Sequence, residues 1–232
     1  MCGRFTLATS LTTVAQRFAV RMPTAESAVW TPRYNIALTQ TVIVVSDDGT
    51  RHLTQMQWGL IPSWAKDPAI GNRMINARAE TVATKPAFRV ALRKRRCLIP
   101  ADGFYEWQPV WRRKQPVYIT LKTREPFSFA GLWETWSSPD GQEIKTCTII
   151  TTEANGLLRP IHDRMPVILT QEAEAVWLDP TIQEPARLLP LLMPYPADEM
   201  EWYPVSTRVN NPAHDKPECP HPVEHLAAPE RH

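Results

Sequence analysis

The sequence has no long hydrophobic run. Its longest apolar stretches, residues 41–45 and 167–169, are far shorter than the roughly 20 residues that a membrane-spanning helix needs. The amino terminus also lacks the basic region followed by an apolar region that marks a secretory signal peptide. We therefore expect no membrane association and a cytoplasmic location.

Cysteine and histidine are both scarce. The chain has four cysteines, Cys2, Cys97, Cys147 and Cys219. Their spacing matches neither zinc sites nor disulfide frameworks, so we expect a reducing environment, no metal and no other cofactor. Cys97 and Cys147 lie in apolar, strand-like runs and are expected to be buried. Four of the six histidines follow Asn211 without regular ligand spacing, which leaves His52 and His162 in the body of the chain.

The net charge of +2 conceals an uneven distribution. The segment after residue 183 has four Lys/Arg and eight Asp/Glu, which leaves 22 basic and 16 acidic residues before it. Arg93-Lys94-Arg95-Arg96 and Arg112-Arg113-Lys114 contribute much of this excess. Clustered cations suit the phosphates of a nucleic acid, and the nine tryptophans could stack on unpaired bases. Solvated surface and core packing are the commoner explanations, so composition alone leaves both open.

Short β-rich runs separated by turn signals extend from residue 41 to residue 169. Runs this short indicate an α+β fold with a mainly antiparallel, barrel-like sheet and flanking helices. Helices are predicted at residues 11–18, after the capping pair Thr9-Ser10, and at residues 171–178 after Thr170. Residues 76–92 resemble a broken helix. At 232 residues and 43% hydrophobic content we expect one domain, residues 1–210, followed by a disordered Pro- and His-rich tail, residues 211–232.

The first three residues, Met1-Cys2-Gly3, are chemically informative. Small residues after an initiator Met favour its removal, which would make Cys2 the first residue. A terminal Cys has an α-amine with a reference pKa of about 7.7–8.0 and a thiol of about 8.5, both near neutrality. The thiolate could attack an amide with the amine as its base, or both groups could close on an aldehyde as a thiazolidine. An ordinary second residue is the alternative.

Three internal segments have polar residues where catalytic groups are commonly presented. His162 lies in a polar island that leads into an apolar strand. Glu106 lies among aromatic residues, and partial burial would raise its pKa and suit it to proton transfer. Asn76 follows a loop rich in Pro and Trp and could begin a helix. Each residue also has a structural alternative. His162 could be a structural histidine, Glu106 could pair with an Arg, and Asn76 could be a helix cap.

These segments together resemble the SOS response-associated peptidase family over residues 1–210. Six motifs carry the resemblance in chain order: Met1-Cys2-Gly3-Arg4-Phe5, Arg33-Tyr34-Asn35-Ile36-Ala37, Trp58-Gly59-Leu60-Ile61-Pro62, Asn76-Ala77-Arg78-Ala79-Glu80-Thr81, Gly103-Phe104-Tyr105-Glu106-Trp107 and Ile161-His162-Asp163-Arg164-Met165-Pro166. The resemblance implies a β-barrel-like core and a shield for abasic sites. Such a protein binds single-stranded DNA and joins its amino-terminal Cys to the ring-opened sugar through a thiazolidine.

The resemblance also implies residue roles. Cys2 is the nucleophile, Glu106 the acid/base that opens the sugar and permits reversal, and His162 a proton shuttle in the Schiff-base steps. Asn76 holds the amine and the sugar. The residues implied to contact DNA are Arg4, Arg78, Trp107, Thr151 and Arg164. The partner is single-stranded DNA containing abasic sites, and we expect a monomer that is nucleoid-associated when bound.

Two other classes of activity are compatible with the same amino-terminal residues, Met1-Cys2-Gly3. A glutamine amidotransferase also starts Met-Cys-Gly, but here Arg4-Phe5 replaces the Ile-rich strand that normally follows, and the downstream Asn-Gly pair is missing. A peptidase acting on other proteins is the second alternative. A noncatalytic DNA-binding module would leave Cys2 and Glu106 without a role.

Overall fold

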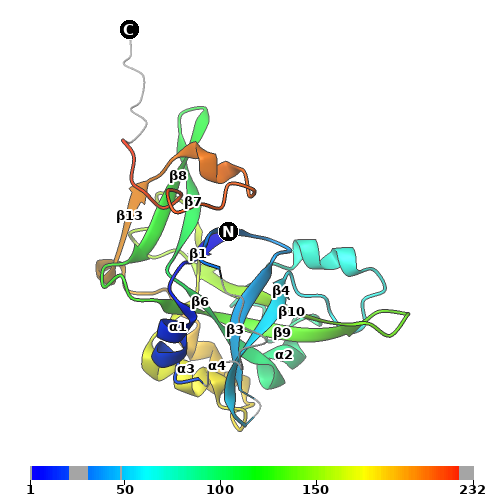
Figure 1. Cartoon of the computed structure of the whole chain (residues 1–232). Helices are drawn as coiled ribbons and strands as arrows, with labels where there is room; N and C mark the ends of the chain where they lie inside the picture. Colours follow the sequence, from blue (N-terminus) through cyan, green and yellow to red (C-terminus); the bar gives the residue numbers. More distant parts are fainter. Residues whose placement is uncertain (1, 21–30, 48, 225–232) are drawn as a thin grey trace.

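A closed ring of five strands forms the centre of the computed structural model, which describes residues 2–20, 31–47 and 49–224 (Figure 1). The ring passes from β10 through β4, β3, β6 and β9 back to β10, and only the β10–β4 pair is parallel. Its strands are β3 (Thr41–Asp47), β4 (Arg51–Trp58), β6 (Arg96–Ala101), β9 (Phe127–Ser137) and β10 (Glu143–Glu153). The predicted barrel-like, mainly antiparallel α+β fold is confirmed.

A second sheet packs against this barrel through aromatic side chains. Its order is β13-β8-β7-β1-β2, where the strands are β1 (Arg4–Leu7), β2 (Arg33–Ala37), β7 (Gly103–Val110), β8 (Arg113–Leu121) and β13 (Met200–Pro204). Phe5 of β1 and Phe104 of β7 lie 5.8 Å and 5.9 Å from the Phe129 ring of the barrel, edge to face. These contacts place β1, and therefore the amino terminus, against the hydrophobic core.

In the described part of the chain four short α-helices flank the sheets: α1 (Leu11–Arg17), α2 (Arg89–Lys94), α3 (Gln171–Leu178) and α4 (Pro185–Leu188). The side chain of Ser10 accepts from the Thr13 amide and caps α1, and Thr170 accepts from the Ala173 amide and caps α3. Both predicted helices and their caps are confirmed. No helix among the described residues is long and apolar enough to cross a membrane.

The expectation of a broken helix over residues 76–92 is wrong for its first part. Asn76–Arg78 forms strand β5, which pairs in parallel with β10 through Ile149, Ile150 and Thr151. Helical structure is confined to α2, after Pro86. The buried Ala77 lies beside a strand some 70 positions away in the sequence, and this long-range pairing overrides the local helical pattern.

The expected disorder of the carboxy-terminal tail is also wrong for residues 211–224. In this segment Cys219 is buried and packs with Tyr105, Tyr118, Val205 and Val209. Hydrogen bonds from β2 hold the same segment, and they supply the stabilisation that its composition does not indicate. Residues 225–232 lie outside the described residues. The single strand predicted after the His162 island, residues 165–169, is divided into β11 (Arg164–Pro166), which pairs with β10, and β12 (Ile168–Leu169), which pairs with β9.

Candidate active site and nucleic-acid interface

Cys2 lies directly before β1 and is fully buried. Its carbonyl oxygen accepts a 2.9 Å hydrogen bond from Nδ2 of Asn76, which β5 holds in place. The Oδ1 atom of Asn76 is buried and has no hydrogen-bond partner among the described residues. An acceptor without a donor therefore lies beside the nucleophile predicted from the sequence.

The pairing of β1 with β7 brings Glu106 to Cys2. Phe5 lies opposite Phe104 in this antiparallel pair. Continuing that register by two residues places Gly3 opposite Glu106, next to Cys2. The negative charge of Glu106 acts on the Cys2 thiol, which confirms that the two groups are close.

The environment keeps the Cys2 thiol protonated. Burial raises its pKa far above the ordinary value, and the nearby carboxylate of Glu106 raises it further. At neutral pH the sulfur is therefore a thiol rather than a thiolate. A reaction at this residue cannot begin from a preformed thiolate and needs a group that removes the thiol proton.

Glu106 is 4% exposed, and burial raises its pKa above the usual range for a glutamate. A positive charge on His162 would act in the opposite direction. A carboxyl group with a raised pKa keeps its proton to higher pH than an ordinary glutamate, which suits it to donate and accept a proton. The expectation from the aromatic surroundings, a raised pKa, is confirmed in direction.

The tautomer of His162 follows from its neighbours. Nδ1 accepts a 2.9 Å hydrogen bond from the Arg164 backbone amide, and the Asp163 carboxylate lies 2.8 Å from the same atom. A backbone N–H can only donate, so we assign Nδ1 as the acceptor. In the neutral ring the proton is then on Nε2. The Asp163 side chain is 85% exposed, and solvent screens its charge.

Arg164 and Thr151 lie where β11 meets β10. Arg164 forms a bidentate ion pair with Glu80, at 2.7 Å and 3.0 Å, and donates to the Thr151 carbonyl oxygen at 2.6 Å. The Arg164 hydrogen bonds lower the pKa of Glu80. Arg78 sits opposite Thr151 in the β5–β10 pair, is exposed, and forms no ion pair within the described part of the chain. Of these residues, Arg78 is the one whose charge is open to a phosphate.

The structure gives Arg4 a different place from the phosphate contact that the resemblance implies. Its guanidinium is buried, and Nη1 donates to Oδ1 of Asn35 at 2.7 Å and to the Val209 carbonyl at 2.6 Å. Nη2 donates to the Asn210 carbonyl at 3.2 Å. The guanidinium also lies 5.7 Å from the ring centre of Trp107, whose Nε1 donates to Asn210. Arg4 therefore positions Trp107 and the chain around residue 210.

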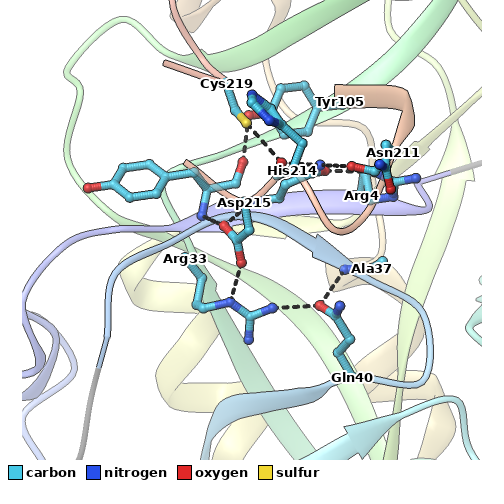
Figure 2. Close-up of polar contacts among 11 residues, drawn as sticks. Arg4, Arg33, Ala37, Gln40, Tyr105, Asn211, His214, Asp215 and Cys219 are labelled. Carbon is cyan, nitrogen blue, oxygen red and sulfur yellow. Dashed lines mark hydrogen bonds and ion pairs between the residues drawn. The ribbon is translucent and has the colours of Figure 1, made fainter. Parts of the chain in front are cut away.

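Residues 206–224 form what we call the carboxy-terminal clasp, which closes over β1, β2 and β7 (Figure 2). Asp215 is its main anchor. The Asp215 carboxylate accepts from the backbone amides of Tyr34 and Asn35 and pairs with Arg33. Nδ2 of Asn35 donates to three carbonyl oxygens of the clasp, those of Val209, Asn211 and His214. The motif 33–37 was visible in the sequence, but no local pattern pointed to its partner Asp215.

Replacement of Asp215 by Ala should open the clasp without unfolding the barrel. The substitution leaves the amides of Tyr34 and Asn35 without their charged acceptor, an interaction that contributes roughly 1.5–3 kcal/mol. We expect hydrogen exchange at these two amides to become about 10- to 100-fold faster. Glu218→Ala is the matched control, since that carboxylate lies 3.4 Å from His214 and forms no other ion pair with the residues that the structure describes. Unchanged exchange in Asp215→Ala would show that the clasp does not depend on this carboxylate.

Burial of Glu106 should make the stability of the protein depend on pH. The folded chain binds the Glu106 proton more tightly than the unfolded chain, so its contribution is fully present below the unfolded pKa of about 4.3. The contribution is lost as the pH rises through the raised pKa. Glu106→Gln removes this loss, and its free energy of unfolding relative to wild type should increase from about pH 4 to pH 8.

Urea unfolding at several pH values measures this difference. Glu80→Gln is a control of opposite sign, because Arg164 lowers the pKa of Glu80. The stability that Glu80 contributes is present above its unfolded pKa and is lost as the pH falls through the lowered value. A Glu106→Gln difference that stays constant with pH would contradict the raised pKa.

Comparison with known proteins agrees with this arrangement. A family model for SOS response associated peptidase (SRAP) matches residues 1–212. Abasic site processing protein YoqW of Bacillus subtilis is 49% identical over 220 residues, covering 94% of this chain and 98% of that protein. Abasic site processing protein HMCES of Xenopus tropicalis is 36% identical over 197 residues, covering 75% of this chain and 58% of that protein.

A crystal structure from Bacteroides thetaiotaomicron has the same fold, with a TM-score of 0.88 and 29% identity over 96% of this chain and all of that one. Fold and sequence motifs thus agree along nearly the whole chain. The protein belongs to the SOS response associated peptidase family.

Proposed function

We propose that this chain shields abasic sites in single-stranded DNA during the response to DNA damage. Cys2, after removal of Met1, forms a covalent thiazolidine with the ring-opened abasic sugar. The observation that carries the proposal is an amide and a carboxyl group beside one buried cysteine, with an imidazole near that carboxyl group. The names of the relatives, abasic site processing proteins, agree with it.

The chemistry begins at the amine because burial keeps the thiol protonated. The neutral α-amine of Cys2 adds to the aldehyde carbon, and loss of one water gives an imine. The thiol then adds across the C=N bond, so that sulfur bonds to carbon and the thiol proton ends on nitrogen. No oxidant or reductant is consumed. Hydrolysis of the Met1–Cys2 peptide bond must come first, because that bond occupies the amine, and this step accounts for the peptidase in the family's name.

Glu106 supplies the proton transfers in this scheme. A neutral carboxyl group protonates the ring oxygen of the closed sugar, and the carboxylate then takes the thiol proton during ring closure and passes it to the nitrogen. His162 lies near enough to lower the pKa of Glu106, and its Nε2–H can return protons in the imine steps. Asn76 orients the new amine through its buried Oδ1, which has no partner among the described residues.

The DNA strand is held through phosphates and stacking. Arg78 is exposed beside the site and binds a phosphate, while Arg164 and Thr151 shape the pocket wall. Trp107 is half-buried on β7, one residue after Glu106, and its ring offers a surface for a base. The protein acts as a monomer in the cytoplasm and is nucleoid-associated when it is bound to DNA.

Intact mass of the purified protein tests the role of the amine. Wild type should lack Met1 and should gain the mass of an abasic oligonucleotide less one water. A residue inserted between Met1 and Cys2 should abolish the adduct, and Cys2→Ala should form only a labile imine because the ring needs sulfur. Intact DNA without abasic sites and free glutamine are the controls. Full cross-linking by the insertion variant, or conversion of glutamine to glutamate, would reject the proposal.

Glu106→Gln should slow both formation and release of the cross-link. Glutamine keeps the shape and hydrogen bonding of the side chain but cannot transfer the proton. The expected loss is roughly 10²–10⁴-fold, with release affected more than formation. Transfer of a pre-formed cross-link to a second, labelled abasic strand measures release. Equal release rates in variant and wild type would remove Glu106 from the mechanism and leave His162 as the proton-transfer group.

A further inference from the structure

The β7–β8 hairpin extends beyond the sheet that supports its base (Figure 1). On one side β1 pairs with β7 only at Gly103 and Phe104, and on the other β13 pairs with β8 only over residues 117–121. Among the described residues, no further strand pairs with either edge of the outer part. We call residues 110–114 at its end the hairpin tip.

The hairpin tip has an unusual residue in its loop. Val110 pairs with Arg113, so Trp111 and Arg112 form a two-residue connection. Trp111 has a φ of 56° and is 62% exposed. Short hairpin loops favour Gly, Asn or Asp at positive φ, because larger side chains are strained there. Trp111 combines conformational strain with an exposed aromatic surface, and neither improves folding.

Three cations follow this tryptophan. Arg112, Arg113 and Lys114 are all exposed, and none of them forms an ion pair with any residue in the described ranges. The tip thus offers one aromatic face and three open positive charges at the end of a projecting arm. An aromatic face next to basic side chains suits unpaired bases and their phosphates.

We propose that the hairpin tip binds the single-stranded DNA that flanks the abasic nucleotide, a proposal that rests on the function proposed above. Continuity with the site supports this occupant, since the same strand carries Glu106 and Trp107. Five residues of strand separate Glu106 from Trp111, about 17 Å at roughly 3.3 Å per residue. A flank of a few nucleotides spans that distance. Trp111 stacks on a base, and the three cations bind phosphates.

Binding of oligonucleotides with a non-reactive abasic analogue tests this without covalent chemistry. One oligonucleotide has two nucleotides on each side of the analogue and another has ten. Wild type should bind the longer one more tightly. Trp111→Gly should lose most of that gain, roughly 5- to 150-fold if one stacked base is lost, while its affinity for the short oligonucleotide stays unchanged.

Trp111→Gly also separates binding from folding. Glycine adopts positive φ without strain, so the melting temperature should be equal to or above that of wild type. Trp111→Phe keeps an aromatic face and should restore most of the gain.

The matched control is the double reversal Arg93→Glu and Lys94→Glu on α2, whose side chains are exposed elsewhere on the molecule. Arg112→Glu with Arg113→Glu makes the same change of charge in the tip and should abolish the gain.

Binding should also be measured with oligonucleotides that are extended on one side of the analogue only. We expect the tighter binding to appear with extension on a single side, either 5′ or 3′. An equal ratio of long to short affinity in wild type and Trp111→Gly would overturn the inference about the tip. If wild type cross-links abasic DNA but shows no dependence on length, only this inference fails. If wild type neither binds nor cross-links abasic DNA, the proposed function fails and this inference fails with it.

Discussion

The buried guanidinium of Arg4 is the interaction on which the arrangement of the site depends. It joins β1 to Asn35 of β2 and to the carbonyl oxygens of Val209 and Asn210 in the clasp. A buried guanidinium that lost one of these acceptors would be costly, so the three segments are stable only together. Arg4 lies two residues after Cys2. The contacts that order the clasp therefore also fix the direction in which the nucleophile enters the core.

Burial has opposite consequences for chemistry and for stability at this site. It raises the pKa of both the Cys2 thiol and the Glu106 carboxyl, and each group when charged would raise that of the other. The resting site therefore favours protonated forms, which suits a reaction that begins with an amine and later needs a proton donor. The same burial lowers folding stability wherever Glu106 is ionised. Proton transfer near neutral pH and maximal stability cannot both be obtained from this carboxyl group.

The sequence predicted those features that depend on neighbouring residues. Alternation and capping residues located α1, α3 and most strands, and the aromatic surroundings of Glu106 indicated its raised pKa. The failures involve distant partners. Strand β5 has only three residues and exists because β10 pairs with it, and the clasp is held by Asp215 despite a composition typical of disorder. No local pattern indicated the buried acceptors of Arg4, two of which, the carbonyl oxygens of Val209 and Asn210, lie more than 200 residues away.

Strand β7 places a buried proton-transfer group and exposed phosphate-binding cations in different parts of the same hairpin. The two functions need opposite degrees of exposure to solvent, so one location could not serve both. Its first four residues, Gly103 to Glu106, are buried, and the remaining four are partly or fully open to solvent. Proton transfer needs the low dielectric around Glu106, whereas phosphate binding needs cations that water and DNA can reach. Lys114 and Arg113 of the hairpin tip pair with Pro109 and Val110, three and four positions from Glu106, which is about 10 Å and about 13 Å along the strand. Both distances exceed the Debye length of about 8 Å at physiological ionic strength, so those charges can attract DNA without lowering the raised pKa of the carboxyl group.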